Sequence, residues 1–209
     1  MTVEPMKATW VSPPVVRKIP LALLLAFEVA WLWVLMLFLH EVGHCATALL
    51  TGGQITTTDL RPGIPGHTLV NPDPQPDLVV WGGFLSGCGV PALIWAVCVG
   101  LRLPLRVEAQ SFTGFCLLAN GAYLAAGGSE SLTDTGVLLQ LGWSWPLLIV
   151  IGLGLAIPGY ALLRHAFLQR LAGLRLRQNL WRSVLVRGLL FVLWVSLQAA
   201  LTIQFHLAG

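Results

Sequence analysis

Charged side chains are scarce in this sequence. Asp, Glu, Lys and Arg make up 10% of its 209 residues, whereas hydrophobic residues make up 56%. A soluble domain usually carries about 25% charged residues. So few charges would leave a soluble fold of this length without enough polar surface, which favours a lipid bilayer as the solvent and a single domain. The formal net charge of +3 is too small to indicate a nucleic-acid partner.

Cysteine is also sparse and has no pattern. The four cysteines lie apart, mostly within apolar runs, and no two form a CxxC pair. Without such a pair, neither a disulfide framework nor a thiolate metal site is indicated. We therefore expect buried free thiols at Cys45, Cys88, Cys98 and Cys116.

Long apolar runs, in contrast, are abundant. A membrane helix needs about 20 predominantly apolar residues, and the first run is too long for the apolar core of a cleaved signal peptide. The proline-rich stretch 53–77 begins with a β-branched, strand-like run. The sequence therefore predicts an all-α integral membrane protein with about five transmembrane helices and a short β-hairpin or extended loop after the first. The expected spans are residues 19–50, 77–100, 109–127, 145–163 and 188–207.

The distribution of Lys and Arg suggests an orientation for these spans. Residues 1–18, 102–106 and 164–187 are basic, whereas 53–77 and 128–142 carry only one arginine between them. Basic loops usually face the cytoplasm. We therefore expect a cytoplasmic N-terminal segment (1–18) followed by one membrane-embedded domain (19–209), with His44 and Asp134 near the opposite, outer face.

The only dense group of ionisable residues in the first span is His40-Glu41-Val42-Gly43-His44. Two histidines four residues apart lie on one face of a helix, where both imidazoles can bind one tetrahedral Zn²⁺. Glu41 is then placed to act as a general base on a water held by the metal, as in HExxH metalloproteases. The alternative is that these residues merely mark the membrane interface at a helix end.

A catalytic zinc commonly has three protein ligands, so a third one should come from another segment on the same side of the membrane. Asp134, in Thr133-Asp134-Thr135-Gly136, is the preferred candidate, because its loop returns to the level of His44. Glu130 and His67 are the competing candidates. The alternative for each of them is an ordinary solvent-exposed side chain.

Residues 39–53 resemble the motif helix of the site-2-protease-type M50 metallopeptidases, in particular the compact bacterial M50B-like branch. Members of that branch continue with a Gly-Gly pair, a β-like segment, a Pro-Gly…Gly-x-Thr stretch and a Gly-rich second helix. The resemblance covers most of residues 35–142. The corresponding segments here are Gly52-Gly53, residues 54–60, 62–68 and 81–87.

The family takes its third zinc ligand from an Asp-Gly-type motif, which Asp134-Thr135-Gly136 matches with one residue inserted. Larger members also place an Asn shortly before that Asp. The resemblance therefore implies that Asn120 holds substrate or an oxyanion, whereas the residue considered alone favours an interhelical hydrogen bond.

The resemblance implies an intramembrane zinc metalloprotease in a bacterial plasma (inner) membrane. Its partners would be the lipid bilayer and a membrane-protein or membrane-peptide substrate, cleaved in or near a transmembrane segment. The alternative function is a non-enzymatic metal-binding membrane scaffold or chaperone-like protein with the same fold. The sequence does not indicate an oligomeric state.

Overall fold

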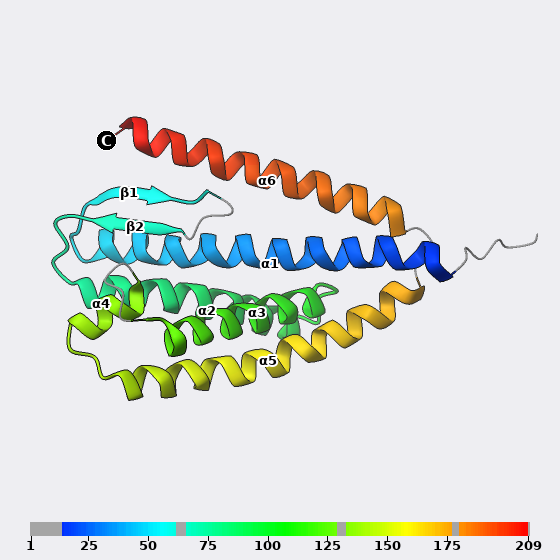
Figure 1. The fold of residues 1–209 in the computed structure, drawn as a ribbon, viewed down its shortest axis with the longest axis horizontal. Helices are drawn as coiled ribbons and strands as arrows, with labels where there is room; N and C mark the ends of the chain where they lie inside the picture. The colour runs from blue at the N-terminus through cyan, green and yellow to red at the C-terminus, as the bar shows by residue number, and fades with distance from the viewer. Residues whose placement is uncertain (1–13, 62–65, 129–132, 177–179, 209) are drawn as a thin grey trace, which may run out of the picture.

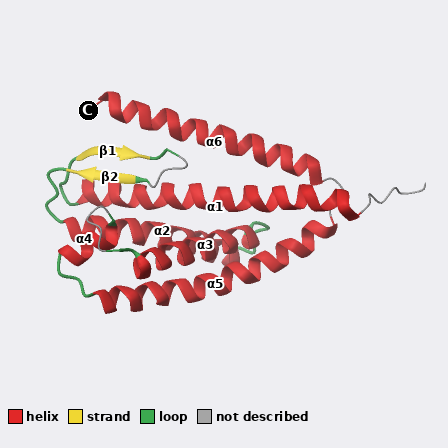
Figure 2. Ribbon diagram, in the orientation of Figure 1, coloured by secondary structure: helices red, strands yellow, loops and turns green. Residues whose placement is uncertain are grey.

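The computed structural model describes residues 14–61, 66–128, 133–176 and 180–208 (Figure 1). These residues form six helices and one antiparallel pair of strands, so the structure is mostly helical (Figure 2). The predicted cytoplasmic segment 1–18 lies largely outside the described residues. In chain order the elements are α1 (Pro14–Leu50), β1 (Ile55–Asp59), β2 (His67–Val70), α2 (Pro76–Gly100), α3 (Arg106–Ala126), α4 (Asp134–Gln140), α5 (Trp145–Leu176) and α6 (Leu180–Ala208).

Helix α1 runs through the middle of the bundle, with α6 on one side and α2, α3 and α5 on the other (Figure 1). It has 37 residues, which is about 55 Å at 1.5 Å per residue. The helix ends where Gly52 adopts a φ of 83°, a left-handed conformation that suits glycine. The amide of Gly53 then donates to the carbonyl of Ala48 at 2.8 Å. This turn directs the chain back over α1 as the hairpin.

Four helices of the described chain are long and apolar enough to cross a membrane: Lys18–Leu50, Pro76–Gly100, Trp145–Ala172 and Leu180–Ala200. The expectation of an all-helical membrane fold with a small hairpin is confirmed, but the count of five spans is only approximate. The expected span that is not among these four helices corresponds to α3, which has 21 residues but carries several polar side chains. Ser111, Thr113 and Asn120 are buried against protein, as polar groups at membrane depth usually are.

The segment 164–187, expected to be a basic loop, is mostly helical. Helix α5 continues to Leu176 and α6 begins at Leu180, so both are longer than the predicted spans. Arginine and leucine, which dominate this segment, are good helix formers. The helices therefore extend past the apolar runs that the sequence marks as spans.

Small residues allow α2 to approach α1 closely. A Cβ on Gly43 would lie 2.2 Å from the carbonyl oxygen of Gly82, closer than any side chain could fit. A Cβ on Gly82 would in turn lie 2.1 Å from the hydroxyl of Thr47. Close approach through small residues is typical of helix packing in membranes, and here it brings α2 against the motif end of α1. All four cysteines are free, as expected.

The hairpin lies beside the motif end of α1, between α1 and α6 (Figure 1). In its register, Thr58 pairs with Thr68 and Asp59 with His67. Asp59 is 2% exposed, and Arg61 Nε donates to its carboxylate oxygens at 2.9 and 3.0 Å. The hydrogen bonds from Arg61 lower the pKa of Asp59, so this carboxylate stays charged. The ion pair fixes the end of β1 that leads into the turn.

Candidate metal centre

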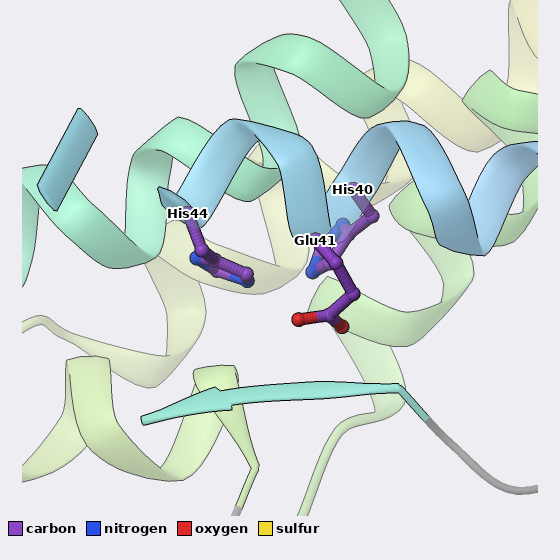
Figure 3. Close-up of side chains that lie close together, drawn as sticks. All are labelled: His40, Glu41 and His44. Carbon is purple, nitrogen blue, oxygen red and sulfur yellow. The ribbon is translucent and has the colours of Figure 1, made fainter. Parts of the chain in front are cut away.

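Helix α1 presents three ionisable side chains together. His40, Glu41 and His44 each offer a ligand atom, and these atoms lie within 4.8 Å of one another. All three residues are buried, at 6%, 2% and 6% exposure. Figure 3 shows the two imidazoles one helical turn apart, with the Glu41 carboxylate reaching out beside them. The spacing predicted from the sequence is therefore realised in the folded chain.

Asp134 reaches the same two imidazoles from the first residue of α4. Its Oδ2 atom lies 2.8 Å from His40 Nε2 and 3.5 Å from His44 Nε2. Ligands placed tetrahedrally at 2.0–2.1 Å from a zinc ion are about 3.3 Å apart. The two observed separations lie on either side of that value, so the three donor atoms converge as ligands of one ion would.

Capping of α4 fixes the position of Asp134. The Thr133 hydroxyl accepts a hydrogen bond from the Gly136 amide at 3.0 Å, which makes Thr133 the N-cap residue. The backbone amide of Asp134 donates to the Tyr123 hydroxyl at 3.2 Å.

Two acceptors behind the imidazoles decide which ring nitrogens face Asp134. His44 Nδ1 lies 2.8 Å from the Val79 carbonyl oxygen, which can only accept, so this nitrogen carries the proton. His40 Nδ1 lies 2.8 Å from Asn120 Oδ1. The amide nitrogen of Asn120 donates to the Cys116 carbonyl at 2.9 Å, which leaves its oxygen for His40. Each histidine therefore donates from Nδ1 and turns Nε2 toward Asp134.

Whether a metal ion fits depends on where the imidazole protons lie. With Nδ1 protonated, the neutral rings present two Nε2 lone pairs, and Asp134 adds a carboxylate oxygen. Three lone-pair atoms at such distances repel one another unless a proton or a metal cation lies between them. A histidine that binds a metal through Nε2 usually donates its Nδ1–H to a carbonyl or carboxylate. The donor set therefore fits a zinc ion held by His40, His44 and Asp134.

Glu41 is the second carboxylate near the imidazoles, but it faces the hairpin. The Thr68 hydroxyl of β2 donates to Glu41 Oε2 at 2.7 Å. A Cβ on Gly66, directly before β2, would lie 2.8 Å from Glu41 Oε1, so a larger residue there would have to displace the Glu41 carboxylate. Glu41 is held by Thr68, whereas Asp134 touches both Nε2 atoms, so Asp134 is the better placed of the two carboxylates to supply a third ligand.

A comparison with protein families agrees with the resemblance found in the sequence. The family model described as Peptidase M50B-like matches residues 18–126, more than half of the chain. The chain belongs to the Peptidase M50B-like family. Comparison with curated proteins and with solved structures finds no match. The family match includes both histidines, Glu41 and Asn120 but ends before Asp134, so the structure alone brings Asp134 to the centre of this M50B-like protein.

The competing third ligands are placed differently. His67 is exposed on β2, opposite Asp59, and contributes to the field around that carboxylate. Glu130 lies outside the described residues. Asn120 hydrogen-bonds His40, so it forms the interhelical bond that its residue type favours. A substrate-holding role for it stays a prediction.

Sequence reasoning missed several groups that shape the centre of the M50B-like chain. A Cβ on Gly83 would lie 2.4 Å from both Nε2 and Cε1 of His44 and 2.9 Å from His40 Nε2. The Gly-rich run 81–87 did not indicate that the imidazoles fill the space beside Gly83. The Val79 carbonyl and Tyr123 carry no sequence signal, because only the fold brings them near the motif. Thr68 belongs to the Gly-x-Thr stretch of the resemblance, but its contact with Glu41 is visible only in the structure.

Proposed function

We propose that this M50B-like chain is a zinc-dependent intramembrane peptidase that hydrolyses peptide bonds in or near membrane-spanning segments of other membrane proteins. The observation that carries the proposal is the convergence of two Nε2 lone pairs and the Asp134 carboxylate, with both Nδ1 protons already committed. A zinc ion held there supplies Lewis acidity and an activated water near neutral pH.

Residues of the chain itself would carry out the remaining tasks of the reaction, namely proton transfer and the orientation of the reacting groups. Glu41 lies beside the metal position without competing for it, so its carboxylate can take the proton of the attacking water and pass it to the leaving amine. Thr68 orients Glu41 through a hydrogen bond of 2.7 Å. Asn120 and the Val79 carbonyl hold the two imidazoles in the required tautomer.

The hairpin supports a peptide rather than a small molecule as substrate. The sheet has two strands in the described part of the chain, so each strand keeps an unpaired edge. An extended peptide can add to such an edge through backbone hydrogen bonds. Because β2 also contacts the Glu41 carboxylate through Thr68, a peptide held along this hairpin would lie next to the general base.

The proposed setting is the plasma membrane of a bacterium, with the centre near the outer face and membrane proteins or membrane peptides as substrates. The distribution of arginines and the four candidate spans support this setting. A metal-binding membrane scaffold without activity is the second candidate. It is favoured by the fact that the family match ends at Ala126, before the third ligand.

The substitution Glu41→Gln separates the two candidates. We expect the purified variant in lipid nanodiscs to keep its zinc and to lose cleavage of a transmembrane reporter peptide by about 10²–10⁴-fold, because the amide cannot accept the proton. Zinc content and product formation by mass spectrometry are the two measurements.

Asp73→Asn is the matched control, because it also replaces a carboxylate by an amide but lies in the loop before α2. It should cleave like the wild type. Unchanged cleavage by Glu41→Gln would refute the base assignment, and zinc without cleavage in the wild type would favour the scaffold.

A further inference from the structure

A cavity of about 680 Å³ lies far from the metal centre, between the first half of α1, the start of α3 and the second half of α5. Glu28 of α1 lines it, twelve residues before His40, which is about 18 Å along the helix. Neither the proposed chemistry nor the family match assigns a role to this cavity. Its volume is in the range of pockets that hold small organic molecules.

Ionisable groups gather at one end of this cavity. Glu28 is paired with Arg170 and, at 2.6 Å, with Arg187. Arg170 also lies 3.5 Å from Glu108. Arg164 lines the same cavity, is exposed and has no ion-pair partner among the residues that the structure describes. Three arginines face two glutamates, so one positive charge is left to attract an anion.

The cavity lies near the α2–α3 loop, at the end of the bundle where the basic segments are expected to face the cytoplasm. Gly82 of α2 packs on α1 beside Gly43, and α2 ends at Gly100, about 27 Å further along. The α2–α3 loop therefore comes level with the first half of α1, and Pro104 of that loop lines the cavity together with Leu24. Figure 1 shows α1, α5 and α6 continuing past this loop.

The lining changes from charged to apolar along the membrane normal. Glu108 and Arg170 lie near the α2–α3 loop, whereas Leu32, Phe115 and Tyr160 line the cavity further along their helices toward the metal centre. Arg164 lies between the two groups, because Leu163 before it packs beside Gly114. A lipid in the basic-side leaflet has the same order, with its headgroup at the interface and its acyl chain toward the bilayer centre. Basic pockets between helices on the cytoplasmic side are typical sites for anionic lipid headgroups.

We propose that this cavity binds one anionic phospholipid from the basic-side leaflet. The phosphate contacts Arg164 and the Glu28–Arg170–Arg187 cluster supplies the positive field. An acyl chain fills the apolar part between α1, α3 and α5. The bound lipid would hold these three helices together at the end of the bundle opposite the metal centre. The site does not depend on peptidase activity.

The test is lipid binding to the full chain. Delipidated protein in detergent is titrated with phosphatidylglycerol or phosphatidylcholine, and bound lipid is counted by native mass spectrometry. We expect one phosphatidylglycerol to bind at least fivefold more tightly than phosphatidylcholine. Arg164→Gln should reduce the preference for phosphatidylglycerol by about fivefold, because one arginine near a lipid surface contributes about that factor to the affinity.

Arg106→Gln is the matched control, because it removes the same charge at the same end of the bundle but does not line the cavity. It should keep the preference. Val29→Trp adds a bulky side chain to the cavity wall and should weaken both lipids, with an unchanged unfolding temperature in lipid-free detergent as the check on folding.

Three outcomes would overturn the proposal. Equal binding of the two lipids excludes recognition of the anion. Equal losses in Arg164→Gln and Arg106→Gln indicate general surface attraction. Competition by free glycerol phosphate without any effect of Val29→Trp indicates an anion site that holds no acyl chain.

Discussion

The two ends of the helix bundle bury ionisable groups in opposite ways. At the metal end, two imidazoles and a carboxylate, all of them potential metal ligands, face one another. At the other end, the paired end, the carboxylate of Glu28 is matched by Arg170 and Arg187. A buried charge is tolerated when it is paired. The comparison teaches that one end gathers groups that can bind a cation, whereas the other gathers a carboxylate together with the arginines that neutralise it.

Removing one imidazole should have the largest effect at the metal end. We expect His44→Ala to reduce zinc content from about one ion per chain to background, because two of the three ligands cannot hold the ion in a closed site. Asp134→Ala should lower zinc affinity strongly as well. Elemental analysis of the purified proteins is the measurement.

His67→Ala is the control for these two variants, because its side chain is exposed on β2. It should retain zinc. The ligand assignment would have to be abandoned if His67→Ala lost the metal while Asp134→Ala kept it.

Two glutamates at the paired end differ in burial, so substituting each of them tests the contrast between the two ends of the bundle. Glu28→Gln leaves Arg170 and Arg187 without their shared partner and should destabilise the protein by about 2 kcal/mol, below the 3–5 kcal/mol of a fully buried pair because the group is partly exposed. Glu108, with a side chain 47% exposed and 3.5 Å from Arg170, should matter less than about 0.5 kcal/mol when changed to Gln.

Thermal unfolding in detergent measures both glutamate variants. Equal destabilisation by Glu28→Gln and Glu108→Gln would show that burial does not distinguish the two carboxylates. In that case the contrast between the ends would reduce to the metal centre alone.

The last expected change concerns the wall of the metal centre. Gly83→Ala places a Cβ 2.4 Å from His44 Nε2, so the ring must move and zinc affinity should fall by about 10–100-fold, as it does when an orienting group is lost. Gly89→Ala in the same helix is the control, because a Cβ there meets nothing within 4 Å. Competition with a zinc chelator measures both, and equal affinities would mean that α2 can shift away.

Both the membrane-helical fold and the local geometry of the motif were predictable from the sequence, because each depends on short-range properties. Apolar runs identify membrane helices, and the spacing of His40 and His44 puts both imidazoles on one face whatever surrounds the helix. The Gly52-Gly53 stop and the β-branched run after it predicted the hairpin. The number of spans was less certain, because α3 hides its polar side chains against other helices and so lacks a purely apolar signal.

Contacts across the fold were decided only by the tertiary structure. Asp134 is far from the motif in sequence. It was the preferred of three candidate ligands, but only the fold shows α4 bringing it to 2.8 Å from His40. The tautomers of both imidazoles depend on Asn120 and the Val79 carbonyl, which come from α3 and α2. The sequence determined a helix able to hold a metal ion, because four-residue periodicity is local. Only the packing of distant helices decided which atoms complete the site, because coordination depends on positions in space and not on order along the chain.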